Sequence, residues 1–508
     1  MALTQNEYGF DLKVDNPFLI FRVLAKVAQE KVGVDKVLDL SRGDPGYGFA
    51  PNSRSRKFYS FLVALDTHFN NFDTHFKDRV VGEEAELLRQ IDAFANETYK
   101  PEVANELMKD FTEFCAGVIE AAHRQELEWN HFDVLFHLFK YATVSGGCYH
   151  DPYGELISRV VVADYHSQNL LTSVKYSDLV LTHGASDAIG TFFKAFGEEG
   201  SKWLVKGDSV LITSPVYFPY MNILKSRGLN ILTVSVNPEN GQFDEDTFEK
   251  LGDAKPKLIV LVDPDNPTGF TKNEASLKLL AAYAEKVDAM ILSDEVYHSF
   301  HPGKKSILNF ARNRTIRIDA RSKIERATGC RFGEFIVVDE ANTYLTKMLK
   351  GFIPASAEDI KHYLYIAKGP GSAFGEFQHT TFVPGPGQIL SLCHIILGEK
   401  ERAKYVDLLK QNMETWYAGL GLKWGGNFYY SQFDMNAIST DAKKKIPAER
   451  KLLDLAERGV VLIPANLFFS VEDREAADRR NYVRGSLPNL TNSQVAEAAK
   501  IIREYLQS

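Results

Sequence analysis

The chain has 508 residues, of which 44% are hydrophobic and 25% charged, and its formal net charge is -8. This length is enough for two or three domains with a large buried core, and the acidic balance argues against a nucleic-acid-binding protein. Its four cysteines lie far apart without a Cys-x-x-Cys pair, and no stretch has the length and hydrophobicity of a membrane span. We therefore expect a cytoplasmic protein with no metal site and neither a nucleic-acid nor a membrane partner.

The N-terminal part predicts helices around one short strand. Apolar residues at helical spacing run from 17 to 32, and residues 37–46 have the pattern of a strand that enters a Gly/Pro turn. From 52 to 140 the apolar residues recur with a period of about 3.6, which is typical of helices. We interpret residues 52–140 as a helical insertion.

The stretch from 141 to 387 alternates β-branched runs with segments of helical length. Each run is apolar and leads into polar residues, as expected for a buried strand of a parallel sheet. These runs are 209–213, 231–236, 258–262 and 289–293. Helices between them would cover both faces of a mostly parallel central sheet, which predicts a large α/β domain. Functional residues of such a domain gather at the carboxyl ends of the strands.

Residues 388–508 favour a smaller α+β domain, to which we also assign residues 1–51. Its predicted helices span 399–418, 448–458 and 493–506, and its predicted strands span 428–433, 460–463 and 482–486. The sequence thus predicts three parts, which are this small domain, the helical insertion at 52–140 and the large domain at 141–387.

The stretch from 322 to 333 contains a lysine, Lys323, ahead of a turn with glycine, and Arg331 follows it. A lysine that forms a Schiff base must be held firmly at a carbonyl carbon, with its pKa lowered so that the amine is a nucleophile at neutral pH. A nearby arginine suits a phosphate. Basic surface turns are also common in globular proteins, so the rest of the chain has to decide.

A phosphate site is also indicated by the sequence from 182 to 188. Gly184, Ala185 and Ser186 stand where a helix should begin, and the free backbone N–H groups at a helix N-terminus can bind a phosphate. An ordinary capped helix would have the same sequence.

Two further residues follow predicted strands. Tyr217 could stack on a flat heteroaromatic ring, although an aromatic residue at such a place is more often part of the core. Asn266 lies in a turn where its amide could bind a ligand, and Asn-Pro is also a routine turn former.

An acidic residue, Asp294, ends the apolar strand at 289–293, and Tyr297 follows a short turn later. A buried aspartate is costly unless it pairs with a cation, such as a protonated ring nitrogen. The alternative is that Asp294 only caps a helix.

Together these residues suit one cofactor, pyridoxal 5'-phosphate (PLP). Its aldehyde needs a lysine, its ring nitrogen an acid, its phenolic oxygen polar donors, its ring face an aromatic side chain, and its phosphate an arginine and a helix N-terminus.

In these residues the chain resembles the fold-type I enzymes of the class I/II aminotransferase superfamily. The resemblance extends from about Leu40 to the C-terminus and rests on the motifs Asn266-Pro-Thr-Gly, Asp294-x-x-Tyr297, Ser322-Lys323, Arg331-x-Gly333 and Tyr482-Val-Arg484-x-Ser486. It implies PLP as the cofactor, an α-amino acid as the substrate, and a homo-oligomer of two or more chains.

The resemblance also implies roles for the matched residues. Lys323 would carry the cofactor and shuttle protons, while Asp294 keeps the ring nitrogen protonated. The remaining cofactor contacts would come from Asn266 and Tyr297 at the phenolic oxygen, Tyr217 on the ring, and Ser322, Arg331, Gly184, Ala185 and Ser186. Arg484 would form a bidentate pair with the substrate α-carboxylate; its alternative is an exposed salt bridge.

Within the superfamily, the chain resembles the bacterial aspartate 4-decarboxylases in its helical insertion and in three further segments, which are Arg42-Gly-Asp-Pro45, Ala327-Thr-Gly-Cys-Arg-Phe-Gly333 and Gln378-His-Thr380. The residues that match Arg42 and Tyr149 lie at the substrate side of the site in that family. Two positions depart from the expected pattern, because Ala320 stands where a serine usually contacts the phosphate, and Gly385 falls near the place of a later threonine. Of the two neighbours of Ala320, Asp319 would repel the phosphate if it were turned toward it, and Arg321 could replace the lost contact if it faces that way.

The implied reaction passes through an external aldimine and a quinonoid, and several outcomes follow from the same first steps. We rank transamination slightly above aspartate 4-decarboxylation because of the two departures. Elimination, replacement and carbon–carbon bond formation at the side chain remain open. A non-catalytic binding protein with this fold is a remote alternative, because such a protein has no need for both Lys323 and Asp294.

Overall fold

The computed structural model describes residues 17–45, 53–68, 84–140, 151, 153–237, 239–354, 357–367, 385–470 and 481–508. The chain folds into two compact units. The first unit comprises Met1–Gly48, Lys206–Ala289 and Lys404–Ser508, and the second comprises Phe49–Val205 and Met290–Ala403. The predicted boundaries of three domains stay a prediction. Of the predicted site residues, Tyr149 lies outside the described residues.

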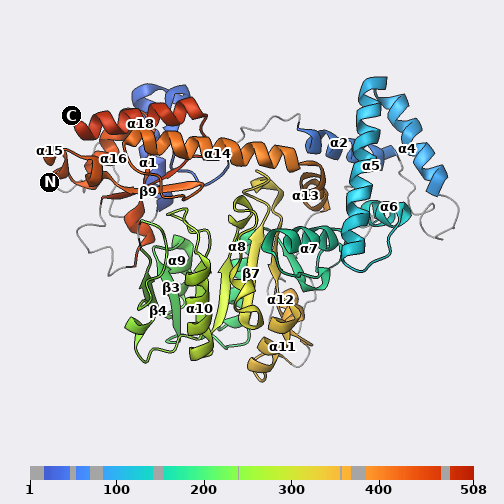
Figure 1. Ribbon diagram of the computed structural model, residues 1–508, viewed down its shortest axis with the longest axis horizontal. Helices are drawn as coiled ribbons and strands as arrows, with labels where there is room; N and C mark the ends of the chain where they lie inside the picture. The colour runs from blue at the N-terminus through green and yellow to red at the C-terminus, as the bar shows by residue number, and fades with distance from the viewer. Residues whose placement is uncertain are drawn as a thin grey trace. The chain divides into compact units, whose positions relative to one another are not determined.

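Parallel strands form one part of the first unit (Figure 1). Strand β3 (Ser209–Ser214) pairs in parallel with β4 (Asn230–Ser235) on one side and with β5 (Leu258–Val262) on the other. Every residue of β5 is buried, which explains its continuous apolar sequence. Helices α9 (Phe218–Ser226) and α10 (Glu274–Val287) lie in the same unit.

An α+β layer forms the other part of the first unit. Its antiparallel sheet has the order β11 (Ile463–Pro464), β12 (Tyr482–Ser486) and β9 (Tyr430–Asp434). A separate pair joins β1 (Leu38–Asp39) to β10 (Val460–Val461). Around one hydrophobic core gather α1 (Pro17–Val32), α16 (Ala448–Ala456), α18 (Asn492–Gln507) and the C-terminal part of α14 (Glu399–Leu420), and the short helix α15 (Asp441–Lys444) lies in the same unit (Figure 1).

The strands of the second unit follow the order β2 (Leu179–Thr182), β8 (Gly333–Ile336), β7 (Thr315–Ala320) and β6 (Met290–Asp294). Strands β6 and β7 are parallel, whereas β8 is antiparallel to both of its neighbours. Helix α8 (Ala185–Phe196) packs on β2, β7 and β8. The unit also contains α11 (Asp339–Met348) and α12 (Ile360–Ala367).

Helices form most of the described part of residues 52–140, which the sequence predicts to be a helical insertion. They are α2 (Arg54–His68), α4 (Glu84–Thr98), α5 (Pro101–Arg124) and α6 (His131–Lys140). They share a hydrophobic core with α7 (Leu156–Leu170) and α13 (Gly385–Leu397), so the insertion packs into the second unit rather than standing apart from it (Figure 1). None of the described helices is long and apolar enough to cross a membrane.

Candidate active site

Lys323 lies in a turn that directly follows β7. The turn is closed by two backbone hydrogen bonds, from the Glu325 N–H to the Arg321 carbonyl at 3.2 Å and from the Arg326 N–H to the Lys323 carbonyl at 3.3 Å. The Lys323 amine lies 5.8 Å from the centre of the Tyr297 ring. Ser322 and Lys323 are both half-buried. The hydrogen-bonded turn therefore holds Lys323 beside Tyr297, another residue of the predicted site.

Asp294 is the last residue of β6 and is only 3% exposed. It lies opposite Ile318 of β7 in the parallel pairing, so both strands end at the same edge. Tyr297 is buried and precedes the short helix His298–Phe300 that follows β6. The second unit thus brings Asp294, Tyr297 and Lys323 to one edge of its strands, as the sequence predicts for functional residues of parallel strands.

The predicted phosphate turn lies in the same unit. Gly184 caps α8 with a φ of 78°, a conformation that favours glycine. A side chain on Gly184 would place its Cβ 3.1 Å from the Arg331 Nη2 atom, which donates a hydrogen bond to the His183 carbonyl at 3.0 Å. The first N–H groups of α8, from Ala185 and Ser186, have no acceptor within the helix. Arg331 and the helix start therefore present hydrogen-bond donors side by side.

Gly333 is needed at this turn because the backbone approaches it closely. It pairs with Thr182 of β2 and Ala320 of β7, and an added Cβ would lie 2.7 Å from the Gly184 Cα atom. Gly333→Ala is expected to displace the turn and lower the affinity for PLP about tenfold or more, since phosphate donors act only when well positioned. Fluorescence titration of the apoprotein with PLP measures this effect.

Gly329→Ala is the matched control, because a Cβ at Gly329 meets no atom within 4 Å. Equal PLP affinities of the two variants would contradict the assigned role of the close approach.

The first unit holds a second group of predicted residues around Arg484. Arg484 lies on β12 and is 5% exposed, and its Nη1 atom donates to the Asn266 Oδ1 atom at 3.1 Å. Its Nη2 atom donates to the Ser41 carbonyl. The guanidinium carbon lies 4.7 Å from the Tyr430 ring centre and 5.3 Å from that of Phe468. Arg484 is therefore a fixed, flat cation and not the exposed salt bridge of the alternative reading.

Two other predicted residues of the first unit are more accessible. Tyr217 precedes α9, is half-buried and lies edge-on to Tyr220, with ring centres 6.3 Å apart. The Arg42 side chain is 54% exposed and its Nη2 atom lies 2.8 Å from the Asp44 carboxylate. An exposed ion pair of this kind contributes little to stability, so Arg42 is available to a ligand.

The neighbours of Ala320 do not take over the role of the missing serine. Side chains alternate along a strand, and those of Asp319 and Arg321 lie on the face opposite to that of Ala320. Asp319 is paired with Arg317 at 2.8 Å and with Arg321 at 3.1 Å. Asp319 therefore offers no repulsion, and Arg321 no compensating contact, on the face of Ala320.

Glu325 follows the lysine turn and is 5% exposed. Burial raises its pKa from the ordinary 4.5 to about 8, although the charges of Arg321 and Arg402 partly offset this effect. The folded state then holds a proton that the unfolded state has lost, so protonation stabilises the fold fully below pH 4.5 and this contribution disappears as the pH rises to about 8.

Glu325→Gln is expected to remove this pH dependence because the amide cannot ionise. Thermal melting between about pH 5 and pH 9 should show the wild-type protein falling below the variant by at least a few degrees at the alkaline end. Melting curves that stay parallel over the whole range would contradict the shifted pKa.

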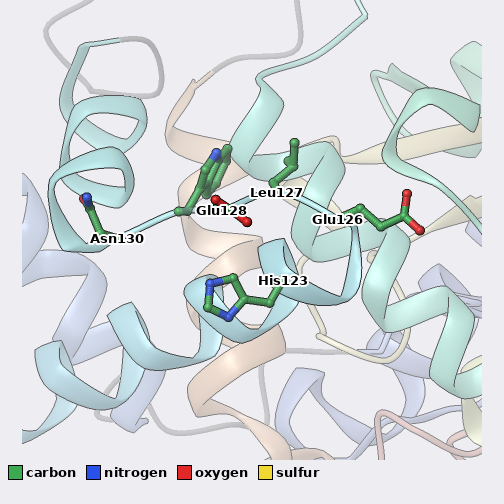
Figure 2. Close-up of a pocket in the computed structure, with 6 residues that line it drawn as sticks. His123, Glu126, Leu127, Glu128 and Asn130 are labelled. Carbon is green, nitrogen blue, oxygen red and sulfur yellow. The ribbon is translucent and has the colours of Figure 1, made fainter.

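A pocket of about 570 Å³ lies elsewhere, at the turn between α5 and α6. Figure 2 shows its lining residues, which are His123, Glu126, Leu127, Glu128, Trp129 and Asn130. Most of these side chains are exposed, and none belongs to the predicted site. We assign this surface pocket no part in the chemistry.

The sequence did not reveal a cluster of buried charged residues behind β6, β7 and β8. Ligand atoms of His166, Asp319 and Glu334 lie within 4.8 Å of one another, a spacing that could hold a metal ion. However, the Arg321 Nη2 atom lies 3.1 Å from both carboxylates. Because a guanidinium already occupies the place of a cation, we describe the cluster as an ion-pair network.

Comparison with known proteins gives matches to one family. Residues 140–369 match the family described as aminotransferase class I and II. A protein from Pseudomonas sp named bifunctional aspartate aminotransferase and L-aspartate beta-decarboxylase is 26% identical over 360 residues, which cover 64% of this chain and 66% of that protein. An aspartate aminotransferase from Thermotoga maritima is 29% identical over 206 residues, 39% of this chain and 52% of that protein. Both relatives are thus matched over less than two thirds of their length.

Solved structures agree with the fold class. The aspartate aminotransferase from Thermus thermophilus with maleate has a TM-score of 0.56 at 20% identity, with 77% of this chain and 88% of that chain covered. The N-succinyldiaminopimelate aminotransferase from Mycobacterium tuberculosis has a TM-score of 0.60 at 16% identity, with 96% of each chain covered. The predicted α/β fold of fold type I, with a mostly parallel central sheet, is confirmed.

Proposed function

We propose, from the relationship of residues 140–369 to the class I and II aminotransferases, that this chain is a PLP-dependent enzyme that acts on an α-amino acid as an aminotransferase. The observation that carries the proposal is that the second unit brings three of the predicted residues together. Lys323 lies beside Tyr297, at the edge of the strands where β6 ends with Asp294. An amine and a buried acid together have a use in a reaction and none in simple binding.

The residues of the second unit suit PLP in both charge and shape. The Lys323 amine matches an aldehyde, the Asp294 carboxylate matches a protonated ring nitrogen, and Arg331 with the start of α8 matches a phosphate. The space in front of Gly184 would be filled by any larger residue, since a Cβ there already meets Arg331 at 3.1 Å. When bound, PLP supplies an electron sink for the bond-breaking step at the substrate α-carbon.

The protein residues around that sink bind, orient and move protons. Lys323 would anchor the cofactor and then carry a proton to and from the substrate α-carbon, as a general base and acid. Asp294 would hold a proton on the ring nitrogen, and its burial would strengthen this charge pair. Tyr297 and Asn266 would donate hydrogen bonds to the phenolic oxygen, and Tyr217 would stack on the ring.

Arg484 would orient the substrate by its α-carboxylate. Its guanidinium is a planar fork that fits a carboxylate with two parallel hydrogen bonds. The rings of Tyr430 and Phe468 keep this fork in place, so little freedom is lost on binding. Arg42 and Tyr149 are proposed at the substrate side, and the exposure of Arg42 supports a contact with a second acidic group.

A second candidate reaction is aspartate 4-decarboxylation, which one specific observation favours. The Pseudomonas relative, matched over 360 residues, carries both activities in its name. Both reactions would begin with proton removal by Lys323, so the residues described above serve either one. Products distinguish them.

The experiment first asks for a borohydride-reducible absorption band in the purified protein with PLP. The holoenzyme is then incubated with aspartate and 2-oxoglutarate. Oxaloacetate and glutamate are expected from an aminotransferase, and alanine with carbon dioxide from the decarboxylase. Absence of the band would overturn the PLP assignment, and absence of both product pairs would overturn aspartate as the substrate.

We also propose a cytoplasmic homo-oligomer of at least two chains. The relationship to the aminotransferases supports an oligomer, and sedimentation would contradict it by giving a monomer. The free thiols of Cys115, Cys330 and Cys393 support a reducing compartment; cell fractionation tests the location.

A further inference from the structure

A row of buried charged residues lies behind the strand ends of the second unit. No side chain in it is more than 1% exposed, and its members are Glu295, Arg317, Asp319, Arg321, Glu334 and His166. Arg317 links Glu295 to Asp319 with contacts of 2.8 Å each, and Arg321 links Asp319 to Glu334 with contacts of 3.1 Å each. We call this set the charge row.

The charge row carries more acids than cations. Burial, together with the charges of Arg321 and Arg317, lowers the pKa of His166 well below its ordinary value, so this imidazole is neutral. His166 Nε2 lies 2.7 Å from Glu334 Oε1 and donates to it in this state. Three carboxylates then face two guanidinium groups, with the buried His298 Nδ1 atom also 3.4 Å from Glu295 Oε2, so the loss of either arginine would leave a buried carboxylate with fewer counter-charges.

Arg321 contacts two carboxylates that would otherwise repel each other. Asp319 of β7 lies directly opposite Glu334 of β8 in the antiparallel pairing, where like charges are destabilising. The next pair in the same register is Ala320 with Gly333, and Gly333 packs against Gly184 of the phosphate turn. A separation of the two strands at the charge row would therefore move the phosphate turn.

Arg321 is also the first residue of the turn that carries Lys323. Its N–H donates to the Phe332 carbonyl at 3.1 Å, and its carbonyl accepts the Glu325 N–H at 3.2 Å. Arg321, Ser322 and Lys323 are consecutive, so the side chain of Arg321 fixes the start of the lysine turn through the buried ion pairs.

We propose that Arg321 is a positioning residue for Lys323 and for the Gly184 phosphate turn, acting through the buried carboxylates of Asp319 and Glu334. This inference rests on the proposed function, because it assigns Arg321 an effect on how PLP is held. It differs from a structural role alone, since the effect is expected on the cofactor and not only on the melting temperature.

The test compares Arg321→Met, Arg321→Lys and the double variant Arg321→Met/Glu334→Gln with the wild-type protein. Arg402→Met is the matched control. Arg402 lies over the same Tyr165 ring as Arg321, at 5.9 Å against 4.8 Å, but it donates to the His394 and Ile395 carbonyls instead of the charge row. Three quantities are measured for each protein: the PLP affinity, the pH midpoint of the cofactor–lysine absorption band, and the melting temperature of the apoprotein.

Arg321→Met is expected to lower the PLP affinity about 10- to 100-fold, as loss of an outer partner does at other sites, and to shift the pH midpoint of the band. Lysine should restore most of both, because one nitrogen, Nη2, makes both contacts of Arg321. The double variant should also recover affinity, because it removes one of the two opposed carboxylates. Arg402→Met should match the wild-type protein in affinity and midpoint.

The inference is overturned if Arg321→Met lowers only the melting temperature and leaves affinity and midpoint unchanged. It is also overturned if Arg321→Met does not fold and the soluble Arg321→Lys and double variants bind PLP no better than a variant without its lysine. A wild-type protein that lacks the absorption band overturns the proposed function itself, which is a separate result.

Discussion

Lys323→Ala is expected to abolish the borohydride-reducible absorption band and to lower turnover by about a thousandfold or more, because the proposed function makes one amine both the covalent anchor and the proton carrier. PLP itself should still bind, with reduced affinity, because Arg331 and the start of α8 do not depend on the lysine. Absorption spectra, borohydride reduction and steady-state rates of the purified variant measure these effects.

Lys305→Ala is a matched control for this experiment. The Lys305 amine lies 5.9 Å from the Phe310 ring centre, in the same unit and at nearly the same distance as the 5.8 Å between the Lys323 amine and the Tyr297 ring centre. Lys305 is not among the residues predicted to hold the cofactor, so its variant should keep both the absorption band and turnover. Survival of the band in Lys323→Ala, or its loss in Lys305→Ala, would place the covalent anchor elsewhere.

Much of the fold could be predicted because its strands are continuous apolar runs. Strand β5 and helix α1 lie where the sequence places them, since burial on both faces leaves an unbroken apolar segment and an amphipathic helix has its own period. Strand β7 was not recognised. Its sequence, Thr-Ile-Arg-Ile-Asp-Ala, is buried throughout although it contains Arg317 and Asp319. A search for apolar patterns misses a buried strand that contains charged residues. Such residues can be buried in a sheet only because partners of opposite charge are close to them, and those partners are not visible in the local sequence.

The candidate site divides in the same way. Lys323, Asp294 and Tyr297 were proposed from the chemistry that their residue types allow, and the second unit brings them to one edge; their roles stay a prediction. The charge row could not be predicted, because its members are spread over five elements or turns and are recognisable only by their mutual distances. The orientation of the Asp319 and Arg321 side chains could not be predicted either, because the register of β7 with β8 decides which face of the sheet each side chain occupies.

The site residues of the two units are positioned by different kinds of contact. Backbone hydrogen bonds close the turn of Lys323, and the Arg331 side chain donates to the His183 carbonyl beside Gly184, so these residues depend on the local backbone. Arg484 is held by the Asn266 amide and two aromatic rings, together with the Ser41 carbonyl. Backbone substitutions should therefore act on cofactor binding, whereas substitutions around Arg484 should act on the affinity for the amino acid.

Arg484→Lys is the second change with a large expected effect. Lysine keeps the charge and loses the planar fork, so the KM for the amino acid should rise about 10- to 100-fold while kcat changes much less. The PLP absorption band should remain, because Lys323 and its turn are unaltered. Steady-state kinetics with the amino acid, together with the spectrum of the variant, measure both.

A second substrate tests directly whether Arg484 binds the α-carboxylate. An amine that equals the amino acid substrate except for the missing α-carboxylate should react slowly with the wild-type protein. It should react equally slowly with Arg484→Lys, because this amine never makes the contact that the substitution removes. Arg458→Lys is the control, since the Arg458 guanidinium also lies over a ring, 4.8 Å from the centre of Tyr505, but is exposed. If Arg484→Lys slows the amine as much as the amino acid, then Arg484 does not bind the carboxylate and acts on the packing of β12 instead.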